Sequence, residues 1–192
     1  MHMKKLVLSI SVLFFISSAL NAQTDATKLP AVDKSPMDMS YFPENYPVLK
    51  IKDKAADVPV IRLIYGRPQK AGRVVFGELV EYGIVWRMGA NEATEIEFYQ
   101  SVKFGGKKIP KGRYTLYAIV EKDKWTIIVN KDTDIWGSFK YDIKKDVARM
   151  EVPVTKTTEI IESFSMVFDK TFSGCNLIVA WDTLKVSVPF VF

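Results

Sequence analysis

Short apolar segments, each cut by glycine, proline or charged turns, follow one another from Val48 to the end of the chain. In the segment TEIEFYQSV, Ile96 and Phe98 fall on one side and Glu95 and Glu97 on the other. A period of two is typical of a β-strand with one buried and one exposed face. About ten segments follow this pattern. GRYTLYAIV and WTIIVN lie on either side of the charged tip EKDK, which predicts a β-hairpin.

Helical periodicity is nearly absent. FGELVEYG, residues 76–83, has apolar residues at helical spacing and ends on glycine, and WGSFKYDIKKD, residues 136–146, could form a second short turn. Antiparallel strands with short links and little helix imply a two-sheet sandwich or a closed barrel, and the chain length favours the sandwich. We therefore expect an all-β fold: an antiparallel two-sheet sandwich, jelly-roll-like, with one or two short helical turns.

The first 22 residues, MHMKKLVLSISVLFFISSALNA, place two lysines before an apolar run and then a small residue, Ala22, before Gln23. This order is typical of a secretory signal peptide, and the run is shorter than the roughly 20 apolar residues that span a bilayer. We expect cleavage after Ala22, a periplasmic or secreted protein, and no stable membrane anchor afterwards. Residues 23–47 contain four prolines and predict an extended arm, and residues 48–192 predict a single β-sandwich domain.

The only histidine, His2, lies inside the predicted signal peptide. The mature chain then lacks the usual general base and the commonest metal ligand, which excludes Ser-His-Asp and Cys-His sites. Cys175 is the only cysteine, and its apolar surroundings predict a small buried side chain without a disulfide partner in the chain. We expect no metal and no cofactor. Residues 130–136 carry alternating oxygen-bearing side chains, but they lack the glycine and glutamate of a calcium loop and predict a polar turn.

The charges are interspersed along the chain. There are 27 basic and 22 acidic residues, with a net charge of +5, and they form neither a lysine and arginine run nor a basic helix. A nucleic-acid-binding domain normally presents such a basic patch or stripe. We therefore expect no nucleic-acid partner.

Several longer stretches have the pattern of a known bacterial family: SPMDMSYFP, IYGRPQKAGRVVFGELVEYGIVWRMGANEATEIEF, KKIPKGRYTLYAIV, WTIIVNKDTDIWGSFKY and LIVAWDTLKVSVP. Together, from about Pro36 to the C-terminus, they closely resemble domain of unknown function 2911 in order and spacing. The resemblance implies an exported envelope protein and brings no catalytic assignment. The chain departs from the family pattern at Gly66, where we would expect serine, so no role for a hydroxyl group carries over to this position.

The stretch VWRMGANEAT crowds aromatic, charged and amide side chains around a glycine between two predicted strands. Trp86 and Arg87 are adjacent, so in a strand they point to opposite faces. Arg87 could bind a carboxylate or phosphate group of a ligand. Alternatively, it pairs internally with Glu92 or Glu78 and fixes a corner at Gly89, and the pattern favours this internal pair.

Exposed aromatic side chains on a sandwich often stack on sugar rings, and arginine can bind the acidic groups of a glycan. A pair of carboxylates, Glu92 with Glu78 or Asp134, is the one arrangement that could perform glycosidase-type acid–base chemistry without histidine. No residue is assigned as catalytic. The candidate ligand-binding residues are Arg67, Trp86, Arg87, Asn91, Glu92 and Trp136.

These observations predict a non-enzymatic binding or envelope-associated module, with a glycan or an acidic small molecule as its ligand. Two other hypotheses stay open. The protein could be a carboxylate-based hydrolase of envelope polymers, or a structural subunit that uses a sheet face for contact within a homo-oligomer. The pattern favours binding over catalysis.

Overall fold

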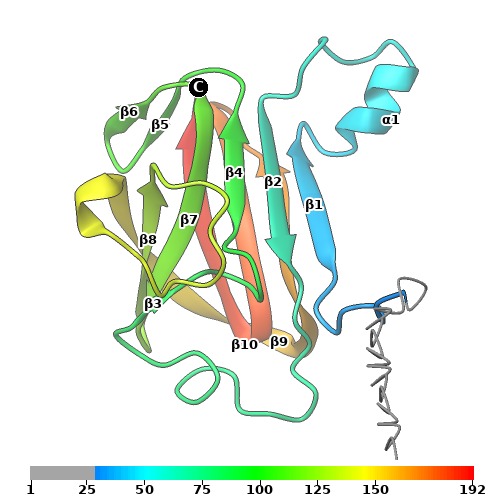
Figure 1. The fold of residues 1–192 in the computed structure, drawn as a ribbon. Coiled ribbons are helices and arrows are strands. Elements are labelled where there is room, and N and C mark those ends of the chain that lie inside the picture. The colour runs from blue at the N-terminus through cyan, green and yellow to red at the C-terminus, as the bar shows by residue number, and fades with distance from the viewer. Residues whose placement is uncertain (1–28) are drawn as a thin grey trace, which may run out of the picture. The chain divides into compact units, whose positions relative to one another are not determined.

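The computed structural model describes residues 29–192, and the predicted signal peptide, residues 1–22, lies outside them. The chain from Val32 to Phe192 forms one compact unit. It contains the elements β1 (Met37–Phe42), α1 (Tyr46–Ile51), β2 (Ile61–Gly66), β3 (Val85–Trp86), β4 (Glu95–Phe98), β5 (Val102–Phe104), β6 (Lys107–Ile109), β7 (Gly112–Val120), β8 (Lys124–Asn130), η1 (Ile143–Lys145), β9 (Asp146–Lys170) and β10 (Gly174–Val191) (Figure 1).

The predicted all-β antiparallel class is confirmed. The strands follow one hydrogen-bonded path in the order β1-β2-β4-β7-β8-β9-β10-β5-β6, with β3 paired to β7. Every strand pair is antiparallel. The expected arrangement of two sheets in a jelly-roll-like sandwich is a finer prediction, which this strand order does not test. No helix within residues 29–192 is long and apolar enough to cross a bilayer.

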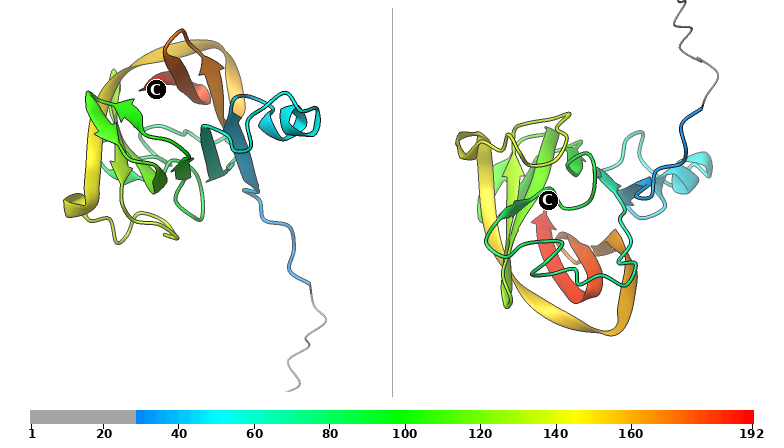
Figure 2. Two further views of the ribbon diagram at one scale, coloured as in Figure 1. Left: turned by 90° about the horizontal axis from the view of Figure 1, so that it is seen from above. Right: turned by 60° about the horizontal axis from the view of Figure 1, so that its bottom comes forward.

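Strand β9 is shared by the two halves of the sheet. Its first residues, up to Pro153, pair with β8, and the part from Val154 onward pairs with β10. The strand is 25 residues long, so it carries the sheet around one side of the core, and the strands surround that core in Figure 2. Residues 155–162, which belong to the part that pairs with β10, include no buried side chain.

Arg67 joins the end of β2 to the second half of β9. Its Nε donates to the carbonyl oxygen of Phe164 at 3.1 Å, and Nη2 donates to Ser165 Oγ at 3.0 Å. Nη1 forms an ion pair with Asp38 at 3.0 Å. The backbone continues the contact, because the amide of Phe164 donates to the carbonyl of Pro68 at 2.8 Å. The β1–β2 edge is thereby held against β9, and the core is enclosed between them.

An aromatic cluster fills the core at the end of the sheet where β3 lies. The Trp86 ring stacks on Trp181 at 6.2 Å, and it meets Phe164 and Trp125 edge-on at 5.2 and 6.0 Å. All four side chains are buried. Each such aromatic pair contributes about 0.5–1.5 kcal/mol beyond its buried area, so the cluster ties β3 to β8, β9 and β10.

Three details differ from the sequence-based expectations. Residues 76–83 form turns and no helix, because Gly77 and Gly83 have positive φ angles of 98° and 74°; in this loop Val80 is buried whereas Leu79 is exposed. Strand β1 and the start of α1 lie in the segment 23–47, which we expected to be an arm. Finally, TEIEFYQSV is interrupted at residues 99–101, so it contributes to β4 and β5 separately. The second helical turn that we predicted is present as η1.

Cys175 is buried at the start of β10 with none of its surface exposed, and burial raises the pKa of its thiol to about 12. The thiolate is the reactive form of cysteine, so the native protein at pH 8 is expected to react with a disulfide reagent only as fast as the chain unfolds. Labelling should be rapid in denaturing urea. Fast labelling of the native protein in buffer would contradict this burial.

Candidate functional site

The stretch after β3 is a corner held by its own hydrogen bonds. Met88, Gly89 and Asn91 have positive φ angles of 55°, 152° and 60°. The backbone amide of Thr94 donates to the carbonyl of Arg87 at 3.0 Å, and the Trp86 indole Nε1 donates to the carbonyl of Gly89 at 3.3 Å. The stretch therefore reverses direction tightly while the Trp86 ring stays in the core.

The end of β2 packs directly against this corner. A Cβ atom placed on Gly66 would lie 2.1 Å from the carbonyl oxygen of Ala90, and one on Gly89 would lie 2.7 Å from the carbonyl oxygen of Gly66. Real Cβ atoms do not approach backbone oxygens this closely. The serine that the family resemblance led us to expect at position 66 would require the corner to move away from β2.

A cavity of about 270 Å³ opens between the corner and the connection from β2 to β3, residues 67–84, which crosses one end of the sheet (Figure 2). Trp86, Trp181 and Pro68 form apolar parts of its lining, and Arg73, Arg87 and Asn91 are among its polar residues. No acidic side chain of the described chain lines it. We call it the arginine cavity.

The arginines divide into two groups. The chain has six, all within the described part. Four form ion pairs with carboxylates: Arg62 with Glu97, Arg67 with Asp38, Arg113 with Glu95 and Asp134, and Arg149 with Asp146. The two that form no ion pair with any residue from 29 to 192 are Arg73 and Arg87, and both line the arginine cavity.

Arg87 directly follows β3 and lines the arginine cavity together with Trp86 and Trp181. Its Nε atom is buried and has no hydrogen-bond partner among the described residues. Burial lowers the pKa of Arg87, because the charged guanidinium loses contact with water, although arginine stays protonated at neutral pH. The internal ion pair that we expected with Glu92 or Glu78 is not formed, so that prediction is wrong.

Arg73 is oriented by backbone rather than by a carboxylate. Its Nε donates to the carbonyl of Lys70 at 3.0 Å, and Nη2 donates to the carbonyl of Gln69. Lys70 Nζ in turn forms an ion pair of 3.1 Å with Asp182 on β10, in which both side chains are largely buried. The positive charge of Arg73 is thus held in place by a loop anchored to the sheet, and no described carboxylate neutralises it.

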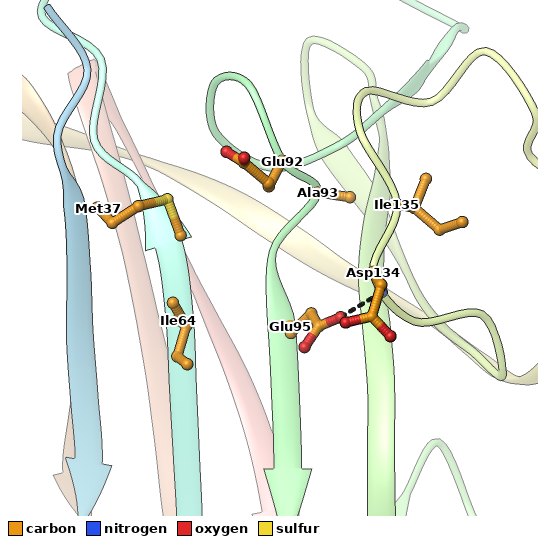
Figure 3. A pocket seen from close by; sticks show the side chains of 7 residues that line it. All are labelled: Met37, Ile64, Glu92, Ala93, Glu95, Asp134 and Ile135. Carbon is orange, nitrogen blue, oxygen red and sulfur yellow. Dashed lines mark hydrogen bonds between the residues drawn. The ribbon is translucent and has the colours of Figure 1, made fainter. Parts of the chain in front are cut away.

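Glu92 lines a different cavity, on the other side of the corner (Figure 3). This cavity, of about 170 Å³, also holds Glu95 and Asp134 above an apolar lining. Figure 3 shows Glu95 and Asp134 beside each other, with Glu92 standing apart from them. Arg113 binds both neighbours, at 3.1 Å to Glu95 and 2.5 Å to Asp134.

The carboxylate pair considered from the sequence, Glu92 with Asp134, therefore shares a cavity. The side chain of Thr133 and then Arg113 donate hydrogen bonds to Asp134 and lower its pKa. A general acid needs a carboxyl group whose pKa is raised toward the working pH. Asp134 is shifted in the opposite direction, so it does not have the property of a proton donor in a glycosidase-type pair.

The six predicted site residues do not converge on one place. Trp86, Arg87 and Asn91 meet in the arginine cavity. Trp136 is 62 % exposed and stacks on Phe139 at 5.8 Å, outside that cavity. Arg67 holds β2 to β9, and Glu92 lies in the second cavity. Sequence reasoning missed Arg73 and Trp181, because nothing in the surrounding residues distinguishes them from other surface and core positions.

Comparison with known proteins places the chain in a family. The family model described as Protein of unknown function (DUF2911) matches residues 47–190. The chain belongs to this family. No curated protein and no solved structure matches it. The matched segment includes the corner and all six arginines. Strand β1 lies before it.

In this DUF2911 protein, Gly66→Ala is expected to lower the free energy of unfolding by about 1–3 kcal/mol, because the added methyl group collides with the Ala90 carbonyl and forces the corner outward. Gly72→Ala is the matched control: its Cβ would meet nothing within 4 Å, and only its positive φ of 72° carries a cost. Urea denaturation of both variants measures the difference. A Gly66→Ala variant no less stable than Gly72→Ala would contradict the close contact.

Proposed function

We propose that this protein is a non-enzymatic binding module of the cell envelope, and that its arginine cavity takes an acidic small molecule or the acidic group of a glycan. One observation carries the proposal. Of six arginines, the two without an ion pair to a described carboxylate line the same cavity. The export signal expected at the N-terminus supports the location.

The electrostatics favour an anion as the ligand. Arg73 and Arg87 place two positive charges around one cavity, and Arg87 is partly removed from water without compensation. A buried charge without a partner is unfavourable, and an anion that enters the cavity would supply that partner. The guanidinium group also has the planar geometry that binds carboxylate or phosphate oxygens in pairs.

The cavity also has the composition of a ligand site. Small-molecule sites combine apolar and aromatic walls with a few polar groups that fix orientation. Here Trp86 and Trp181, both almost fully buried, contribute the smaller apolar part of the lining, and the arginines with Asn91 contribute most of the polar part. Asn91 is itself held, since its Nδ2 donates to Asp33 Oδ1 at 3.0 Å. The side chains are therefore positioned before a ligand arrives.

Replacing Arg87 by methionine tests the proposal. We expect the wild-type protein to bind glucuronate, citrate or inorganic phosphate in low-salt titration calorimetry, and Arg87→Met to weaken that binding by about tenfold or more, since a charge-assisted hydrogen bond is worth roughly 1.5–3 kcal/mol. Arg113→Met is the matched control, because Arg113 is already paired with Glu95 and Asp134 at the second cavity. The Arg113→Met variant should bind these anions as tightly as the wild type does.

The same variant has a second readout. Most substitutions of partly buried residues destabilise a protein, but Arg87→Met removes an uncompensated charge, so its thermal unfolding midpoint should equal or exceed that of the wild type in the absence of anions. Failure of all three anions to bind the wild-type protein, or equal binding by Arg87→Met, would overturn the proposed function.

A further inference from the structure

A second hollow adjoins the arginine cavity. It measures about 600 Å³ and shares two lining residues, Ser35 and Arg73, with the arginine cavity. Because they share these residues, we treat the two hollows as one groove with an inner lobe at Arg87, a junction at Arg73 and an outer lobe beyond it. The outer lobe is the larger of the two, so the groove has more room than a single small anion requires.

The chemistry changes from one lobe to the other. The inner lobe is walled by tryptophan rings and arginines and has no acidic side chain among its described lining residues. The outer lobe is lined by groups of both kinds, donors and acceptors: the hydroxyl of Ser35, the amide of Gln69, the ammonium of Lys34 and the carboxylate of Asp33. This mixed lining suits hydroxyl groups, each of which donates and accepts hydrogen bonds.

Asp33 argues against a second anion in the outer lobe. It is the one carboxylate among the described residues that line either lobe, and its Oδ1 already accepts hydrogen bonds from the amide of Ser35 at 2.6 Å and from Asn91 at 3.0 Å. These contacts hold the carboxylate at the start of the outer lobe, where it repels a negative charge and accepts a hydroxyl proton. The negative group of the ligand is therefore directed to the inner lobe.

The junction is held in place before any ligand binds. Lys70 Nζ donates to the carbonyl of Arg73 at 2.6 Å and to Asp182 on β10 at 3.1 Å, and Arg73 Nε donates back to the carbonyl of Lys70. The loop that carries Lys70 and Arg73 forms the wall between the lobes, and the Lys70–Asp182 ion pair attaches this loop to β10. A ligand that spans both lobes meets a preformed surface, which limits the entropy lost on binding.

From these observations we propose that the groove binds the acidic end of an oligosaccharide: a terminal uronate sugar whose carboxylate lies between Arg87 and Arg73 in the inner lobe, followed by neutral sugar units whose hydroxyls occupy the outer lobe. This proposal rests on the proposed function and specifies its ligand class. It assigns Gln69 as a residue that selects for chain length, and Arg87 as the residue that selects for the acidic terminus.

Titration calorimetry with a graded ligand series tests the proposal. The ligands are glucuronate, a disaccharide and a trisaccharide that each end in glucuronate, and the neutral xylotriose. We expect affinity to rise about tenfold from glucuronate to the acidic trisaccharide, which corresponds to one or two added neutral hydrogen bonds, and no measurable binding of xylotriose. The variant Gln69→Ala, whose residue lines only the outer lobe, should lose much of the gain with length and keep the affinity for glucuronate.

Gln100→Ala is the matched control, because Gln100 is an exposed glutamine that lies between β4 and β5 and lines neither lobe. It should bind the whole series like the wild type. Equal affinity for glucuronate and the acidic trisaccharide, or an undiminished gain in Gln69→Ala, would overturn the inference about the outer lobe while leaving anion binding at Arg87 intact. If xylotriose bound as tightly as the acidic trisaccharide, or if Arg87→Met bound every acidic ligand like the wild type, the proposed function would fall together with it.

Discussion

The packing of the Trp86 indole is the interaction on which the rest of the site depends. The ring lies in the core against Trp125, Phe164 and Trp181, which belong to β8, β9 and β10. This burial fixes the two-residue strand β3 and places the next residue, Arg87, at the start of the corner beside the arginine cavity. The corner that follows, the backbone contact with Gly66 and the arginine cavity are all positioned by the same ring.

The cavity combines stability and function in an instructive way. Four arginines reinforce the fold through carboxylates, and Arg67 in particular closes the sheet against β9. Arg87 has no such partner among residues 29–192 and a lowered pKa, so in the free protein it opposes folding slightly. An uncompensated charge beside a cavity is the property expected of a group that meets its partner on binding.

Much of the sheet could be predicted from local pattern. The hairpin of β7 and β8 lies where two apolar segments flank a charged tip, and both strands are buried on both faces in part of their length. The pattern failed where burial does not follow a period. Residues 76–83 have helical spacing, yet they form a loop in which Val80 is buried and Leu79 is exposed. The long strand β9 has no single period of burial, because neither face of residues 155–162 has a buried side chain.

By itself the sequence determined the all-β class and the lack of histidine after His2, because these follow from the alternation of neighbouring residues and from composition. Only the tertiary structure decided which arginines meet a carboxylate among residues 29–192. Arg67 meets Asp38 and the distant Phe164 when the sheet closes, whereas Arg87 is joined by Arg73 from a loop that crosses the sheet end. Such partners come from long-range strand order, which no local pattern of residues encodes.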